Sequence, residues 1–235
     1  MQSCSPRQAR HAAATALGTL ATGLALVAFA DSPDDWRQAL RPAGDAWRGA
    51  GQHFTFNSGA EPETLDPALV TSLDAFQLVD CLFEGLVGVD PRTLEPRPAA
   101  ADRWTVSPDG LRWSFHLRDG LRWSDERPLG ADDFLWSFRR ALTPATAASY
   151  ASLYDYIEGA EAFRRGQSAD FATVGLRAPD PRTVEFRLRH PCPFLPDLLA
   201  MPVFYPVRAD VVAAHGDKWT QPGKLIGNGA FTSWM

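Results

Sequence analysis

The chain has 235 residues, of which 45% are hydrophobic and 22% charged, so it can bury the core of one large or two small domains. Its formal net charge is −5 and its pI is near 5.5, and its basic residues are scattered, which argues against nucleic-acid binding. The three cysteines form no CxxC pair, which argues against a structural zinc site.

The first thirty residues have the pattern of a secretory signal peptide. A basic start precedes an uncharged apolar run over residues 12–30, and Ala28-Phe29-Ala30 has the small-x-small form of a signal-peptidase site. We therefore predict a cleaved signal over residues 1–30. An uncleaved anchor is the alternative, since the run is barely long enough to span a membrane. The polar stretch over residues 31–52 is predicted to be a linker.

The body of the chain is predicted to begin with a strand over residues 53–58, where apolar and polar residues alternate. Asp66-Pro67 indicates a turn. A helix is then predicted over residues 72–85. Its apolar residues recur at helical spacing: Phe76, Val79, Leu82, Phe83 and Leu86.

The strongest pattern in the chain lies between residues 104 and 142. Large apolar residues alternate with polar ones over residues 111–117, which predicts a strand with one apolar face between two turns. The apolar spacing then becomes helical over residues 131–142. Asp132-Asp133 lies in the first turn of this helix, where the helix dipole favours carboxylates, and Pro144 ends it.

The remainder of the chain is predicted to alternate between helices and strands. Its predicted elements are a helix over residues 150–163, strands over residues 174–178 and 183–188, and an apolar helix over residues 194–200. Cys81 lies on an apolar helix face and Cys192 lies between two prolines. We therefore predict two buried free thiols, with a disulfide between them as the alternative.

The sequence offers no convincing catalytic group. Glu61 with Glu63, and Asp132 with Asp133, could serve as acid–base pairs. No histidine or lysine partner is near the first pair, and the second pair is explained by the helix start. The five histidines are scattered, and there is no nucleophile elbow, HExxH or phosphate-binding loop. We therefore predict a protein that is not an enzyme and has no catalytic residue, metal or cofactor.

Several motifs resemble those of the family 5 extracellular solute-binding proteins, the peptide receptors of ABC importers. Trp123-Ser124-Asp125 with Pro128, followed by Ala131, Asp133 and Phe134, is similar to the family's signature turn and helix start. Further motifs follow the family's order: EPETLDP at residues 61–67, FEGL at 83–86, PAAADRWTVSPDG at 98–110 and NGAF at 228–231. Glu126-Arg127 and Gly130 depart from the pattern, where the family usually has Gly-Thr or Gly-Lys and a capping Thr.

This resemblance implies an α/β fold of the type II periplasmic-binding-protein class, a clamshell of two lobes. Residues 53–81 and 208–235 are expected to form an incomplete first lobe, and residues 82–207 a subdomain appended to it. Members of the family are roughly twice as long, so the distal lobe is expected to be absent. The chain would then be the truncated N-terminal half of such a receptor, and a non-functional fragment is one alternative.

The resemblance also implies a function, namely capture of oligopeptides in the periplasm and their delivery to the permease subunits in the membrane by a monomer. The backbone of Thr71, Ser72 and Leu73 is expected to pair with the peptide, and Tyr150 to reach it from the subdomain. Relatives have an acidic residue at the position of Thr71, so specificity there stays open. An ordinary loop and a packing tyrosine are the alternatives for these residues. Nickel chelates, murein peptides and sugars are the alternative ligands.

Overall fold

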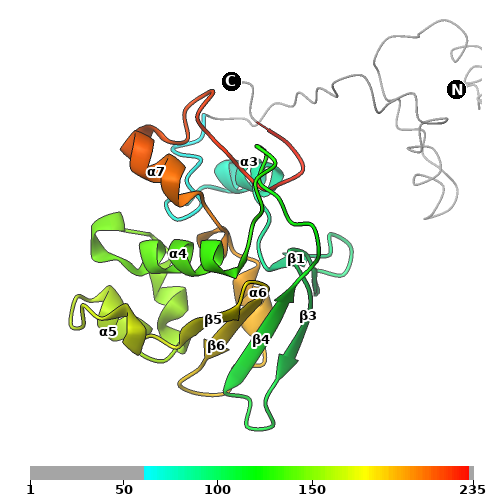
Figure 1. The fold of residues 1–235 in the computed structure, drawn as a ribbon, viewed down its shortest axis with the longest axis vertical. Coiled ribbons are helices and arrows are strands. Elements are labelled where there is room, and N and C mark those ends of the chain that lie inside the picture. Colours follow the sequence, from blue (N-terminus) through cyan, green and yellow to red (C-terminus); the bar gives the residue numbers. More distant parts are fainter. Residues whose placement is uncertain (1–60, 233–235) are drawn as a thin grey trace, which may run out of the picture. The chain divides into compact units, whose positions relative to one another are not determined.

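The computed structural model describes residues 61–232, and the predicted signal, linker and first strand lie outside the described residues. The centre of the described part is a four-stranded antiparallel sheet in the order β3-β4-β6-β5 (Figure 1). Its strands are β3 (Ala101–Val106), β4 (Arg112–Leu117), β5 (Leu176–Asp180) and β6 (Thr183–Arg187). The sheet therefore joins two hairpins that are separated by nearly sixty residues of sequence, from Leu117 to Leu176.

Strand β4 confirms the alternating pattern. Trp113, Phe115 and Leu117 are buried, while Arg112 is exposed. Phe115 pairs with Trp104 of β3 on one side and Val184 of β6 on the other, so the apolar face continues across the sheet.

Helix α4 (Ala131–Leu142) covers this apolar face and has the predicted bounds. Phe134 and Phe138 are fully buried against the sheet. At the helix start, the backbone N–H of Gly130 donates to the carboxylate of Asp133 (2.9 Å). This contact shows why glycine is tolerated at the cap: the third helical residue supplies the side-chain bond.

The helix predicted over residues 150–163 is wrong as a single element. A 3₁₀ helix, η3 (Ala151–Tyr156), is followed by the short helix α5 (Ala160–Arg164). Between them Ile157 bridges to Leu188, and Gly159 has a φ of +72° and lies against the backbone of Thr173. A left-handed residue cannot continue a right-handed helix, so the chain breaks there.

The remaining elements follow the predicted order with shifted ends. The predicted helix over residues 72–85 is α3 (Leu73–Leu82), and that over 194–200 is α6 (Leu195–Leu199). The predicted strand over 174–178 begins two residues later, as β5. The other elements are a hairpin of β1 (Val87–Val89) and β2 (Pro96–Pro98), helix α7 (Ala209–His215), and the 3₁₀ helices Pro144–Thr146, Phe171–Thr173, Pro202–Phe204 and Gly216–Lys218.

Helix α3 ends early because a distant segment pairs with its C-terminal end. The side-chain amide of Asn228 accepts from the N–H of Glu84 (3.0 Å) and donates to its carbonyl (2.8 Å), and Gly229 N–H donates to the carbonyl of Leu82 (3.0 Å). A Cβ on Gly227 or Gly229 would lie 2.0 or 2.5 Å from the backbone of Leu82. The two glycines therefore permit a backbone contact that larger residues would block.

Two apolar clusters form the interior. The larger one joins the sheet, α4 and α6. The smaller one comes from residues 65–83 and 205–219 and contains Leu65, Val70, Ala75, Val79, Leu82, Phe83, Tyr205, Val207, Val211 and Trp219. The two clusters divide the chain at similar places to the predicted lobe and subdomain, and that division stays a prediction.

The described cysteines are both free thiols. Cys192 is buried, as predicted, whereas Cys81 is only partly buried.

None of the helices in the described range is long and apolar enough to cross a membrane.

Candidate ligand-binding surface

The loop that leads into α3 contains three of the four residues predicted to bind the ligand. Ser72 is the N-cap of the helix, and its hydroxyl accepts from the N–H of Ala75 (3.3 Å). Thr71 is exposed, and Leu73 has 77% of its surface exposed, which is unusual for a leucine. The loop therefore presents backbone and one large apolar side chain to the outside.

A carboxylate from the preceding segment holds this loop. Glu63 accepts from Thr71 N–H (2.6 Å), Thr71 hydroxyl (3.1 Å) and Ser72 N–H (2.9 Å) through one oxygen, and from Ser72 hydroxyl (2.6 Å) through the other. The hydrogen bond from the Ser72 side chain, followed by those from the backbone of Thr71 and Ser72, lowers the pKa of Glu63 from 4.5 to about 2. We refer to these contacts as the Glu63 clamp.

Tyr150 lies beside α3. Its ring contacts that of Phe76, with centroids 6.0 Å apart and the planes inclined by 54°. Phe76 lies one turn into α3 and packs on the smaller core, whereas Tyr150 packs on the larger one. The structure thus brings Tyr150 close to the helix that follows Thr71–Leu73, and their role in binding stays a prediction.

The sequence patterns do not predict Phe76 or Glu63 as parts of this surface. Phe76 follows Leu73 by three residues on the same helix, so helical spacing could have linked it to the loop. In the sequence, Glu63 stands out only as a possible acid–base partner of Glu61. Its contacts with Thr71 and Ser72 arise from a turn that returns the chain on itself, for which the sequence carries no periodic signal.

A buried carboxylate fixes the turn between Glu63 and the loop. Asp66 accepts from Arg140 of α4 (3.0 Å for one of two bonds), from Trp219 Nε1 (3.2 Å) and from Ala68 N–H (3.0 Å). Asp66 is 3% exposed. The predicted Asp66-Pro67 turn is present, and the ion pair anchors it to α4.

Arg140 also lines a shallow hollow of about 230 Å³ on α4. The other lining residues are Trp136, Arg139, Thr143 and Thr146. Trp136 packs on the smaller core, as does Phe76. Arg140 therefore lines this hollow and also forms the ion pair with Asp66.

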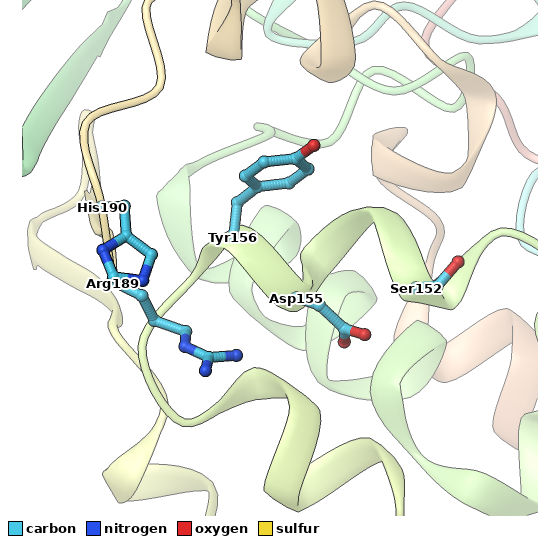
Figure 2. A pocket seen from close by; sticks show the side chains of 5 residues that line it. All are labelled: Ser152, Asp155, Tyr156, Arg189 and His190. Atoms are coloured by element: carbon cyan, nitrogen blue, oxygen red, sulfur yellow. The ribbon is translucent and has the colours of Figure 1, made fainter.

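A larger pocket, which was not predicted, lies between η3 and the segment that follows β6. It has a volume of about 390 Å³ and is lined by Ser152, Asp155, Tyr156, Arg189 and His190 (Figure 2). Asp155 is paired with Arg164 (2.6 and 3.0 Å), and Arg189 with Glu161 (2.8 Å). Because these charges are already neutralised within the protein, the pocket has little to attract a charged ligand.

The described part of the chain shows the surroundings of the carboxylates that the sequence offers as acid–base candidates, and of possible metal ligands. Within residues 61–232, no three His, Cys, Asp or Glu side chains lie together as a metal site would require. Of the candidate acid–base pairs, Asp133 caps α4 and Glu63 holds the α3 loop. Both carboxylates thus have structural partners.

Comparison with known proteins gives a matching family profile and several similar binding proteins. The profile of the bacterial extracellular solute-binding proteins, family 5 (middle region), matches residues 95–233. The chain is 42% identical over 182 residues to the probable deoxycholate-binding periplasmic protein YgiS of Escherichia coli, covering 77% of this chain and 34% of that protein. It is 36% identical over 183 residues to the periplasmic oligopeptide-binding protein OppA of the same organism, covering 77% of this chain and 33% of the relative.

Solved structures of solute-binding proteins are also similar to this chain. The Haemophilus influenzae OppA complex with the peptide RPPGFSPFR matches with a TM-score of 0.71 and 35% identity, over 75% of this chain and 34% of that one. The unliganded murein tripeptide-binding protein MppA matches with a TM-score of 0.69 and 37% identity, over 73% of this chain and 33% of that one. The chain thus spans about a third of the length of the relatives that it matches.

Proposed function

The chain belongs to the bacterial extracellular solute-binding proteins, family 5, and from this premise we propose that it takes part in capturing small peptides. The predicted α/β fold of the type II periplasmic binding proteins is confirmed by the solved structures that it matches. Proteins of this family bind solutes, and their curated relatives include periplasmic oligopeptide- and murein-peptide-binding proteins.

One observation carries the proposal: the exposed loop Thr71–Leu73 lies at the start of α3, next to the ring pair of Phe76 and Tyr150. An extended peptide pairs with protein backbone and leaves its side chains to adjoining pockets, so a loop beside an aromatic pair suits such a ligand. Tyrosine adds a large apolar surface together with a polar hydroxyl. In this proposal Thr71, Ser72, Leu73 and Tyr150 contact the peptide.

A bile acid is the second candidate ligand. The relative that shares 42% identity with this chain is named a probable deoxycholate-binding protein, whereas the OppA relative shares 36%. The same aromatic pair could pack against a steroid ring system, and exposed Leu73 would add apolar surface. A steroid does not pair with protein backbone, so only the peptide would require the backbone of Thr71–Leu73 for binding.

Isothermal titration of the chain with a tri- to pentapeptide library, and separately with deoxycholate, tests the two candidates. Peptide binding that weakens in Tyr150→Ala and persists in Tyr156→Ala would support the proposal. Tyr156 is a matched control because its ring contacts Phe194 (5.5 Å) and not Phe76. Binding of deoxycholate alone would favour the second candidate, and binding of neither would refute both.

We further propose that the protein acts in the periplasm as a monomer and delivers its ligand to the membrane subunits of an ABC importer. The periplasmic location of the named relatives and the signal-like residues 1–30 support this placement. Cell fractionation followed by N-terminal sequencing tests it, with Asp31 expected as the first residue of a periplasmic form. An unprocessed chain in the cytoplasm would contradict the location.

A further inference from the structure

The Glu63 clamp uses hydrogen-bond donors that a peptide ligand could otherwise reach. The backbone N–H groups of Thr71 and Ser72 both donate to the same oxygen of Glu63, at 2.6 and 2.9 Å. Hydrogen bonds to an ionised carboxylate are stronger than those between neutral groups. The loop is therefore held by the protein's own acid before any ligand arrives.

The clamp also connects the loop to helix α3. The Ser72 hydroxyl donates to Glu63 (2.6 Å) and accepts from Ala75 N–H (3.3 Å), so one side chain joins the carboxylate to the first turn of the helix. The backbone carbonyl of Ser72 accepts from Phe76 N–H (3.0 Å), and Phe76 is the residue that contacts Tyr150. Glu63, the loop and the aromatic pair thus form one connected unit.

We propose that Glu63 is a positioning residue for ligand binding, which fixes the backbone of Thr71 and Ser72 and leaves this edge to accept hydrogen bonds from a peptide. The inference rests on the proposed peptide-binding function. Holding the loop in place before binding reduces the conformational entropy that is lost when the ligand docks. Because the N–H groups of Thr71 and Ser72 are occupied, a peptide that pairs with these two residues would use the carbonyl of Thr71 as its acceptor.

Glu61 provides a matched control two residues away. It is an exposed glutamate in the same segment and forms no hydrogen bond to the loop in the described part of the chain. The variants to compare are therefore Glu63→Ala, Glu63→Gln and Glu61→Ala, each in the full chain. Glutamine keeps one acceptor oxygen for the two amides but presents an NH₂ group to Ser72, so it should restore the clamp in part.

Two measurements separate positioning from general stability. Amide hydrogen exchange at Thr71 and Ser72 without ligand reports the clamp, and titration with trialanine reports binding. In Glu63→Ala we expect both amides to exchange about tenfold faster and trialanine to bind about tenfold more weakly, the scale of one hydrogen bond to a charged group. Glu63→Gln should lie between, and Glu61→Ala should match the wild type. All three variants should still unfold cooperatively, with midpoints within a few degrees of the wild type.

The outcomes are distinguishable. Unchanged exchange at both amides in Glu63→Ala would overturn the inference, and so would faster exchange with wild-type affinity for trialanine. A wild-type chain that binds no peptide would overturn the proposed function and with it the ligand role of Glu63, whatever the exchange rates. Weaker binding of trialanine to Glu63→Ala, together with partial recovery in Glu63→Gln, would support the inference.

Discussion

Arg140, in the last turn of α4, forms a buried ion pair with Asp66, in the turn before α3. The side chains are 16% and 4% exposed, and Trp219 Nε1 adds a third contact to the same carboxylate (3.2 Å). The pair joins residues that are 74 positions apart. It connects a helix of the larger core to the turn on which the Glu63 clamp and the α3 loop depend.

Removing the carboxylate should destabilise the protein strongly. In Asp66→Ala, Arg140 keeps a largely buried charge without its partner, so we expect a loss of about 3–5 kcal/mol in the free energy of unfolding. Urea denaturation measures it. Asp102→Ala is the control, because its ion pair with Arg103 is exposed and should contribute less than about 1 kcal/mol. Equal losses in the two variants would contradict the role given to Asp66.

The pairing of residues 227–229 with the end of α3 gives a second prediction. Gly229→Ala would place a Cβ 2.5 Å from the backbone carbon of Leu82. Such an overlap forces a backbone shift, and we expect a loss of about 1–3 kcal/mol in denaturant unfolding. Gly88→Ala is the control, since its Cβ would meet only the Arg97 side chain, at 3.5 Å. A Gly229→Ala variant as stable as wild type would show that the contact is loose.

The contacts of Arg208 predict that the free energy of unfolding falls at acid pH. Arg208 is 5% exposed and donates to Asp210 (2.8 and 2.6 Å) as well as Asp125. These hydrogen bonds lower the pKa of Asp210 from 3.8 to about 2. Since the folded pKa lies below the unfolded one, the contribution of Asp210 to stability is complete above about pH 4 and is lost as the pH falls towards 2.

The variant Asp210→Asn tests this dependence. It should reduce the fall in unfolding free energy between pH 4 and pH 2, measured by urea denaturation at several pH values, and should leave the part that Glu63 contributes, because the pKa of Glu63 is also lowered to about 2. If Asp210→Asn keeps the full slope, the acid sensitivity comes from other carboxylates.

The two described cysteines should react as separate thiols. Burial raises the pKa of both, and for Cys81 the charge of Asp80 raises it further, so alkylation at neutral pH should be slow. Cys81 should react first, because Cys192 is 2% exposed. Mass spectrometry of alkylated peptides measures the order. Failure of both to react in denaturant without reductant would reveal a disulfide.

Local periodicity predicted the elements whose apolar residues repeat at a regular spacing. Alternation over residues 111–117 predicted β4 within one residue, and the bounds of α4 agree at both ends. Each of these elements has one apolar face, and its period depends only on neighbouring residues. The family motifs, which rest on residue identity and not on period, carried the prediction of the fold.

Contacts between distant residues decided the remainder. Helix α3 stops at Leu82 because residues 227–229 pair with the backbone that follows, and the predicted helix over 150–163 breaks where Gly159 meets Thr173. The family resemblance named Thr71–Leu73 and Tyr150, which lie on separate elements, as candidates for ligand binding. Only the tertiary structure brought Tyr150 against Phe76 of α3 and turned Glu63 back onto the loop. Such contacts join separate segments of the chain, so no repeating pattern predicts them.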